Sequence, residues 1–189
     1  MSRFSSHSQS VMSYDGTICL NHYNPFSRPK LEKVVLNLGL KDIVSNKKLI
    51  LSALLALEMV SGQRTVTTKS RKPQIALKVR KGMVTGAKVV LRQFLKYNFL
   101  DKFLTVTLPR IKEFTGFKKI MVTTSGNFSF RIQEPLNFME LEYEYNKFTT
   151  LPSMDVTLVT SVENKIKSLC VLASLGVPFL KKTNYKNVQ

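Results

Sequence analysis

Alternating hydrophobic and polar residues are the main structural signal in this chain of 189 residues, and they predict β-strands. In EKVVLNLGL (32–40) every second residue is Val or Leu, whereas Lys33 and Asn37 lie on the opposite face. AKVVLR (87–92) has the same pattern, with Lys88 and Arg92 on its polar face, and DVTLVTS (155–161) also alternates. These segments predict a sheet with one buried face and one polar face.

Further strands are predicted where the pattern is shorter or less regular. They cover residues 64–68, residues 75–80, and two segments on either side of an SGN turn within 118–133. Gly82 and Gly86 are expected to bracket a loop that leads into the AKVVLR strand.

Helices are predicted in three segments between these strands. Residues 46–60 are apolar on most sides and are followed by a glycine two residues later, as in a buried helix. Residues 93–106 are expected to form a helix that ends before Pro109. Its apolar side chains at helical spacing are Leu95, Phe99, Phe103 and Val106. A final helix is expected over 162–175, with Gly176 at its end.

The order of these elements predicts a single domain of the α+β class. No repeat period is present, and strands and helices do not alternate regularly. We therefore expect an irregular N-terminal arm over residues 1–28, an α+β domain over residues 29–180 and a basic tail over residues 181–189. The sheet should be mainly antiparallel, with helices packed on one face and a ligand-binding face on the other.

The charge of the chain indicates a polyanionic partner. Basic residues number 29 and acidic residues 12, which gives a formal net charge of +17. Between Glu58 and Asp101 there are ten basic residues and no acid. They are Arg64, Lys69, Arg71, Lys72, Lys78, Arg80, Lys81, Lys88, Arg92 and Lys96. An ordinary solvated face mixes both signs of charge, so this interval favours nucleic acid as the partner.

The position of the basic residues distinguishes among polyanions. They lie on predicted strands and loops and not on an amphipathic helix, which disfavours a membrane surface. Composition alone does not decide between DNA and RNA. A flat sheet face with Lys, Arg, Asn and small apolar residues suits the shallow minor groove and exposed loops of RNA.

Residues that carry catalysis or bind a metal are not evident. The chain has no phosphate-binding glycine loop, no HExxH and no CxxC pair, so we expect no enzymatic activity, cofactor, metal or small-molecule substrate. Glu140, Glu142 and Glu144 have strand spacing, and we interpret them as a partner-facing acidic strip. An RNA-acting enzyme and a free-standing RNA chaperone remain alternatives that use the same basic platform.

Several motifs, in this order and spacing, closely resemble the bacterial-type ribosomal protein five family of the large subunit. They are PKLEKVVLNLGL (29–40), VSGQRTVTTKSRKPQIALKVRKGMVTGAKVVLR (60–92), LPRIKEFTGF (108–117), GNFSFRIQE (126–134) and MDVTLVTS (154–161). That family binds 5S ribosomal RNA in the central protuberance, so the resemblance implies a structural protein that contacts 5S and large-subunit ribosomal RNA. It also implies that the RNA-binding face of the sheet is concave and that the α+β domain over residues 29–180 binds ribosomal RNA.

The resemblance also implies sites for individual residues. The predicted ribosomal RNA ligands are Lys33, Asn37, Gln63, Arg64, Lys69, Lys88 and Arg92. The segment from Lys69 to Gly86 resembles an extended loop that reaches the elbow of peptidyl-site transfer RNA. Its predicted phosphate ligands are Arg71, Lys72, Lys78, Arg80 and Lys81. A protein bridge to a basic small-subunit head protein is expected at Arg110, Lys112, Glu140, Glu142 and Glu144.

This sequence departs from the family pattern at a few positions. The family usually has a small hydroxylated residue where Val90 stands, and a Gly often occupies the place of Gln93. Abundant Lys, Asn and Phe (21, 11 and 12 residues) and the divergent arm point to an organellar ribosome in the mitochondrial matrix. A bacterial cytoplasmic or plastid ribosome would show the same core motifs.

Overall fold

The fold of the protein is that of a computed structural model, which describes residues 3–20, 24, 29–40, 48–148 and 151–180. In this part of the chain, five strands form one antiparallel sheet. They are β1 (Leu31–Gly39), β2 (Val66–Lys69), β3 (Val84–Leu91), β4 (Phe128–Ile132) and β5 (Met154–Thr160). Their order across the sheet is β2-β3-β1-β5-β4, so β1 lies at the centre between β3 and β5.

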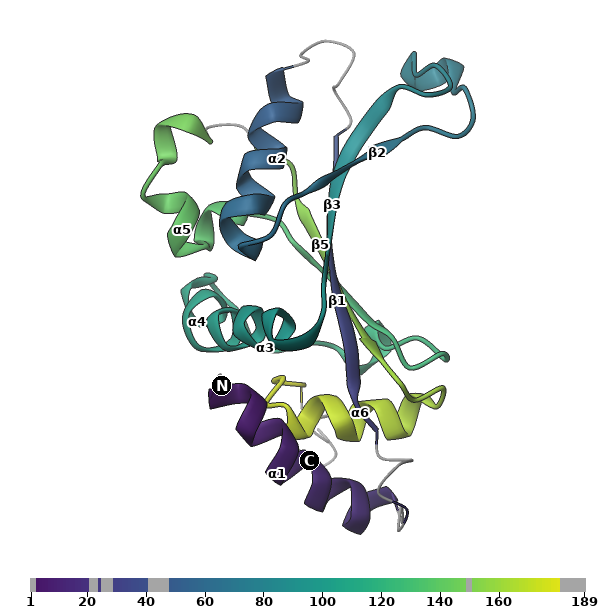
Figure 1. The fold of residues 1–189 in the computed structure, drawn as a ribbon, viewed down its shortest axis with the longest axis vertical. Coiled ribbons are helices and arrows are strands. Elements are labelled where there is room, and N and C mark those ends of the chain that lie inside the picture. Colours follow the sequence, from purple (N-terminus) through teal and green to yellow (C-terminus); the bar gives the residue numbers. More distant parts are fainter. Residues whose placement is uncertain (1–2, 21–23, 25–28, 41–47, 149–150, 181–189) are drawn as a thin grey trace, which may run out of the picture.

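Helices cover one side of this sheet. They are α1 (Arg3–Leu20), α2 (Lys48–Ser61), α3 (Gln93–Lys102), α4 (Leu108–Arg110), α5 (Met139–Glu142) and α6 (Lys165–Ser174). Figure 1 shows α2, α3, α4 and α5 on the same side, with α6 and α1 at the end where β1 begins. The predicted α+β class and antiparallel sheet are confirmed, and so is the packing of helices on one face.

The alternating residues of the strands make the core as predicted. Val34, Leu36 and Leu38 of β1 are completely buried, and the matching positions of β3, β4 and β5 are buried as well. Phenylalanine rings fill the space between the sheet and α3, where the centroids of Phe103 and Phe130 lie 5.1 Å apart. Each buried side chain of this size stabilises the fold by about 1.5–3 kcal/mol, so the sheet is a firm support for its other face.

The N-terminal segment differs from its prediction as an irregular arm, because Arg3–Leu20 forms the helix α1. Phe4 packs against the core and Met12 is buried, and their spacing of eight residues places both on one helical face. A 2.7 Å ion pair between Arg3 and Asp101 also ties α1 to α3. The serine-rich sequence did not predict this helix, because among its described side chains only these two apolar residues face the core.

The basic segment that follows β2 also differs from its prediction. Residues 75–80 do not form a strand, because Ile75–Leu77 is a turn of 3-10 helix at the tip of the β2–β3 ribbon. Among the described residues no further strand lies beside this tip, and Ile75 is 94% exposed. Gly86 belongs to β3 and not to a loop. A side chain at Gly86 would clash with the carbonyl oxygen of Leu38, which explains the glycine.

The helix predicted over 93–106 continues past its expected end. A π-helical turn, Phe103–Thr107, leads from α3 directly into α4. Pro109 therefore stands in the first turn of α4, where its missing N–H group is not needed. Val106 is 39% exposed and not part of the core, because the wider π turn changes the face on which it lies.

Only half of the hairpin predicted around SGN is present. β4 forms, but the residues before the turn include a 3-10 turn at Lys119–Met121 and make only an isolated bridge between Val122 and Phe128. The turn itself is confirmed, since the Thr123 N–H donates to the carbonyl of Asn127 at 2.9 Å. The final helix α6 is capped by the side chain of Asn164. None of the helices in the described ranges is long and apolar enough to cross a membrane.

The 123–127 turn is fixed to α6 by a buried polar cluster. The carbonyl oxygen of Gly126 accepts hydrogen bonds from Thr160 Oγ1 at 2.9 Å and from Ser168 Oγ. Gly126 has a φ of 78°, and a Cβ atom there would clash with the carbonyl oxygen of Val162. This position requires glycine both for its backbone conformation and for its close approach to the chain before α6.

Replacing this glycine gives a direct test of the packing. We expect Gly126→Ala to lower the free energy of unfolding by roughly 3 kcal/mol, because left-handed strain adds to overpacking. Gly62→Ala is the matched control, since Gly62 also has a positive φ of 63° but no atom within 4 Å of an added Cβ. That variant should lose only about 1 kcal/mol in urea unfolding. Equal losses in the two variants would contradict the close packing at Gly126.

Candidate RNA-binding surface

A row of polar side chains crosses the face of the sheet that is opposite to α2 and α3. Asn37 of β1 is the direct cross-strand partner of Lys88 on β3 and of Asp155 on β5. Asp155 in turn pairs with Arg131 on β4, and Lys88 pairs with Val66 on β2. The Cβ atoms of directly opposed residues lie about 4.5–5.5 Å apart, so the strand register itself holds these groups together. We call this face, on the outward side of all five strands, the open face.

Small apolar and hydroxyl side chains form the next row of the open face. Val35 of β1 is the partner of Val90 on β3 and of Thr157 on β5. The hydroxyls of Thr157 and Ser129 lie 3.1 Å apart on β5 and β4. These four side chains include no charge and no aromatic ring.

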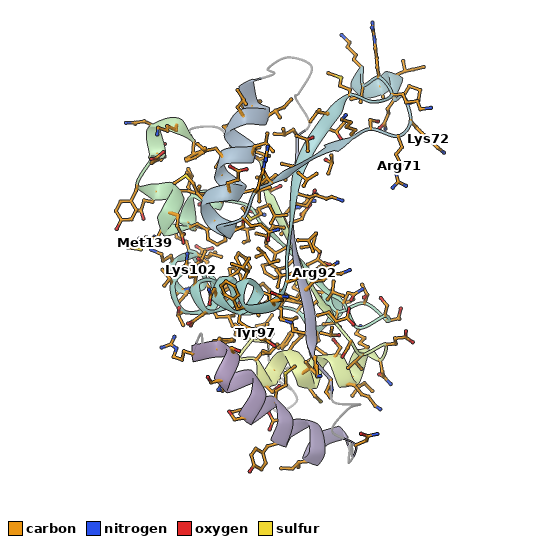
Figure 2. The ribbon with its side chains drawn as sticks, viewed as in Figure 1. Arg71, Lys72, Arg92, Tyr97, Lys102 and Met139 are labelled. Atoms are coloured by element: carbon orange, nitrogen blue, oxygen red, sulfur yellow. The ribbon has the colours of Figure 1, made fainter. Side chains whose placement is uncertain are left out.

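Two further cations lie where β1 begins and β3 ends. Arg92 follows Leu91, the cross-strand partner of Val34, which places Arg92 beside Lys33. Arg92 is exposed at the start of α3, near the middle of the molecule (Figure 2). The structure therefore brings together four of the seven predicted ribosomal RNA ligands on one face: Lys33, Asn37, Lys88 and Arg92.

The other three predicted ribosomal RNA ligands lie around β2. Gln63 and Arg64 are exposed in the turn between α2 and β2, because this strand begins at Val66 and not at 64 as predicted. A hydrogen bond from the Gln63 N–H to Ser61 Oγ, at 3.2 Å, holds this turn. Lys69 is the last residue of β2 and leads into the ribbon tip.

Backbone hydrogen bonds give the ribbon tip (residues 70–83) a defined conformation. The Ser70 N–H donates to the carbonyl of Met83 at 2.8 Å, and Gln74 and Val79 exchange two bonds at 2.9 and 3.1 Å. Lys78 takes a left-handed φ of 51° to close the 3-10 turn. Figure 2 shows Arg71 and Lys72 at the tip of the ribbon, on the side of the sheet away from the helices. The five loop cations predicted to bind phosphate are exposed or half-exposed: Arg71, Lys72, Lys78, Arg80 and Lys81.

The cations predicted to bind RNA take part in no ion pair within the described ranges, although the open face itself holds one, between Arg131 and Asp155. Within the residues that the structure describes, ion pairs join Arg3 to Asp101, Lys102 to Glu140, Arg110 to Glu142, Arg131 to Asp155 and Lys147 to Glu144. In these ranges, no ion pair includes any of the ten cations predicted for the sheet and the ribbon tip. Those cations are Lys33, Arg64, Lys69, Arg71, Lys72, Lys78, Arg80, Lys81, Lys88 and Arg92. Their charges are left for an external anion.

The predicted acidic strip has a different structure and different partners. Glu140 and Glu142 lie on the short helix α5 and not on a strand. Each carboxylate of the strip has a cation of this chain 2.8 Å away: Glu140 with Lys102, Glu142 with Arg110 and Glu144 with Lys147. Lys112, the remaining predicted bridge residue, is exposed. The strip is therefore close to neutral.

Lys96 differs from the other cations of the acid-free interval because it packs against the sheet. Its ammonium on α3 donates to the carbonyl oxygens of Leu31 and Glu32 at the start of β1. It also lies 4.9 Å from the centroid of the Tyr97 ring. Burial lowers the pKa of the Lys96 ammonium. Lys96 belongs to the acid-free interval in the sequence, but its contacts tie α3 to the sheet.

A cavity of about 260 Å³ lies beside β4. Phe103, Phe117 and Phe130 line it, together with Lys112 and Glu134. None of its lining residues among those described is a His or a Cys. The described ranges also contain no group of three or more His, Cys, Asp or Glu side chains that could hold a metal ion.

Replacement of Lys96 separates its role from that of the open face. We expect Lys96→Met to lower the free energy of unfolding by about 1–3 kcal/mol, because two backbone carbonyls lose a donor. RNA affinity of the folded variant should stay within about twofold of wild type at about 0.15 M salt, since the Lys96 ammonium already donates to two backbone carbonyls. Urea unfolding and filter binding measure the two effects. A stable variant with greatly weakened RNA binding would show that Lys96 is an RNA ligand.

Comparison with known proteins relates this chain to a protein family. Residues 24–80 match ribosomal protein L5, and residues 84–179 match the C-terminus of the same ribosomal family. A relative named large ribosomal subunit protein uL5m, from Reclinomonas americana, is 34% identical over 96% of this chain and 100% of its own length. Large ribosomal subunit protein uL5 of Mycoplasma capricolum subsp. capricolum is 38% identical over 86% of this chain and 89% of its own length.

These matches agree with the motifs that indicated the family from the sequence. They include the strands of the open face and the ribbon tip, and the match to the Reclinomonas protein extends to nearly all of the chain. The relatives are ribosomal proteins and not enzymes, as the absence of catalytic motifs predicted. The chain belongs to the ribosomal protein L5 family.

Proposed function

We propose that this protein is a structural constituent of the large ribosomal subunit that binds 5S ribosomal RNA, or the RNA that takes its place, through the open face. The observation that carries this proposal is the set of ten exposed or half-exposed cations that have no ion pair in the described structure. Their mutual repulsion is relieved when RNA phosphates bind and counterions are released.

The chemistry of the open face favours contacts to the RNA backbone. Val35 and Val90 occupy the centre of the face, where proteins that bind single strands place aromatic rings for base stacking. Asn37 and the hydroxyl pair of Ser129 and Thr157 offer hydrogen bonds of the kind that ribose and phosphate groups accept. We expect recognition of RNA shape and not of base sequence.

The ribbon tip is proposed to contact a second RNA, the elbow of peptidyl-site transfer RNA. Its internal hydrogen bonds give the tip a defined conformation, and all five loop cations on it are exposed. A tip that is already ordered loses little conformational entropy on binding, which suits a contact that forms and breaks repeatedly.

The surface around α4 and α5 is proposed to form a bridge to a protein of the small-subunit head. Because the three carboxylates there already have partners, the attraction for a basic protein is weaker than the sequence suggested. Exposed Met139 and Tyr143 on and beside α5 offer apolar contacts for the same purpose. Figure 2 shows Met139 and Lys102 on the helix-covered side, away from Arg92.

We propose the mitochondrial matrix as the location of this ribosome. The match to the uL5m protein extends over 100% of that protein, whereas the match to the Mycoplasma capricolum protein covers 89% of its length. The free-standing chaperone alternative is distinguished by sedimentation, because a ribosomal protein should remain with large subunits washed in high salt.

Charge reversal on the open face tests the proposed function. The variant Lys88→Glu/Arg92→Glu should bind 5S ribosomal RNA about 100-fold or more weakly than wild type, and its log affinity should depend less steeply on log salt. Filter binding of the full chain over a range of salt concentrations measures both effects.

The matched control reverses two cations on the helix-covered side, Lys102→Glu/Lys147→Glu. This variant has the same net charge but should keep binding within several-fold of wild type. Lys102 lies on the helix-covered side (Figure 2), and Lys147 pairs with Glu144 shortly after α5, which is on the same side in Figure 1. Equal losses in the two variants would mean that net charge alone, and not the open face, determines binding.

A further inference from the structure

A negative charge stands within the proposed RNA-binding surface. Asp155 of β5 is the cross-strand partner of Asn37, whose other partner is Lys88. The carboxylate is 37% exposed and therefore accessible to solvent. A bare carboxylate at this position would repel RNA phosphates bound to the neighbouring Asn37 and Lys88.

Arg131 neutralises this carboxylate from the adjacent strand. Its Nε donates to Asp155 Oδ1 at 2.6 Å and its Nη2 to Oδ2 at 3.3 Å, a two-point contact between direct cross-strand partners. The hydrogen bonds and the charge of Asp155 raise the pKa of the Arg131 guanidinium, so it stays protonated. Cross-strand packing alone does not require an arginine, because the pair lies on the polar side of the sheet.

Arg131 also has N–H donors that its contact with Asp155 does not use. A guanidinium has five N–H groups, and the contact with Asp155 uses two of them. The Arg131 side chain is 62% exposed, so the remaining donors are open to solvent on the same face as Lys88 and Asn37. The planar fork of arginine is suited to bind a phosphate with one edge while another edge holds a carboxylate.

The residues near this pair suit the same ligand. Ser129, two residues before Arg131, and Thr157, two residues after Asp155, place their hydroxyls 3.1 Å apart on the open face. The half of the open face formed by β4 and β5 thus offers hydroxyls and one guanidinium and no unpaired acid at these four positions.

We propose that Arg131 is an RNA-binding residue that neutralises Asp155 and donates to a backbone phosphate, which extends the RNA-binding surface across β5 to the β4 edge of the sheet. This inference rests on the proposed function of the open face. It adds a contact that the sequence motifs did not assign, on the side of β1 opposite to β3 and the ribbon tip.

A double-mutant cycle tests this proposal with the full chain and 5S ribosomal RNA. We expect Arg131→Ala to weaken binding about tenfold and to reduce the slope of log affinity against log salt by about one unit. Asp155→Asn should bind at least as tightly as wild type. The double variant Arg131→Ala/Asp155→Asn should recover part of the loss, because it removes the repulsion but does not restore the missing phosphate contact.

Other outcomes overturn specific parts of the proposal. Full recovery in the double variant would exclude the phosphate contact, and Arg131→Ala binding within twofold of wild type would exclude any role in RNA binding. Urea unfolding of each variant checks that the sheet is intact. If Lys88→Glu/Arg92→Glu loses binding while Arg131→Ala does not, the proposed function stands and only this inference fails. If neither variant loses binding, the open face itself is not the RNA-binding surface.

Discussion

Electrostatic repulsion among unpaired cations is the constraint on which this structure depends. Ten cations lie along β1, β2, β3 and the ribbon tip without an ion pair among the described residues, in a chain of net charge +17. Such a surface opposes folding of the free protein and favours any state in which a polyanion covers it. The remainder of the fold holds this surface in place and pairs its neighbouring acid, Asp155, with Arg131.

Two features of the fold resist the repulsion. Buried aliphatic and aromatic side chains fix the sheet against α2 and α3, with Val34, Leu36 and Leu38 completely enclosed. The acids on the helix-covered side are paired with cations there, as in the contacts of Glu140 with Lys102 and Glu142 with Arg110. These carboxylates neutralise cations on the helix-covered side. The open face therefore keeps its excess of positive charge.

The sequence predicted those parts of the fold in which apolar and polar residues alternate strictly along a strand. Strict alternation identified β1, β5 and the second half of β3, and it also placed Lys33, Asn37 and Lys88 on the open face. Alternation gave a wrong prediction where the local backbone conformation, and not the spacing of apolar residues, determines the structure. The ribbon tip has no neighbouring strand within the described ranges to stabilise an extended segment, so Ile75–Leu77 turns into a 3-10 helix.

Tertiary partners account for the other differences. Helix α1 was not predicted because its apolar face consists of few residues and depends on packing against α6 and α3. The role of Lys96 required knowledge of which carbonyls lie next to α3. Arg131 had a signal in the sequence, since alternation in FSFRI places it on the polar side with Ser129, but its pairing with Asp155 depends on the register between β4 and β5.

Crosslinking of intact ribosomes is the most direct test of the central claim that the open face binds RNA. Ultraviolet crosslinking, digestion and mass spectrometry of ribosomes should yield RNA-linked peptides from residues 31–39 and 84–92, and sequencing of the attached RNA should identify ribosomal RNA. Peptides from residues 70–83 should carry transfer RNA only when the peptidyl site is occupied. Crosslinks confined to α2 and α5, with none on the strands, would contradict the account.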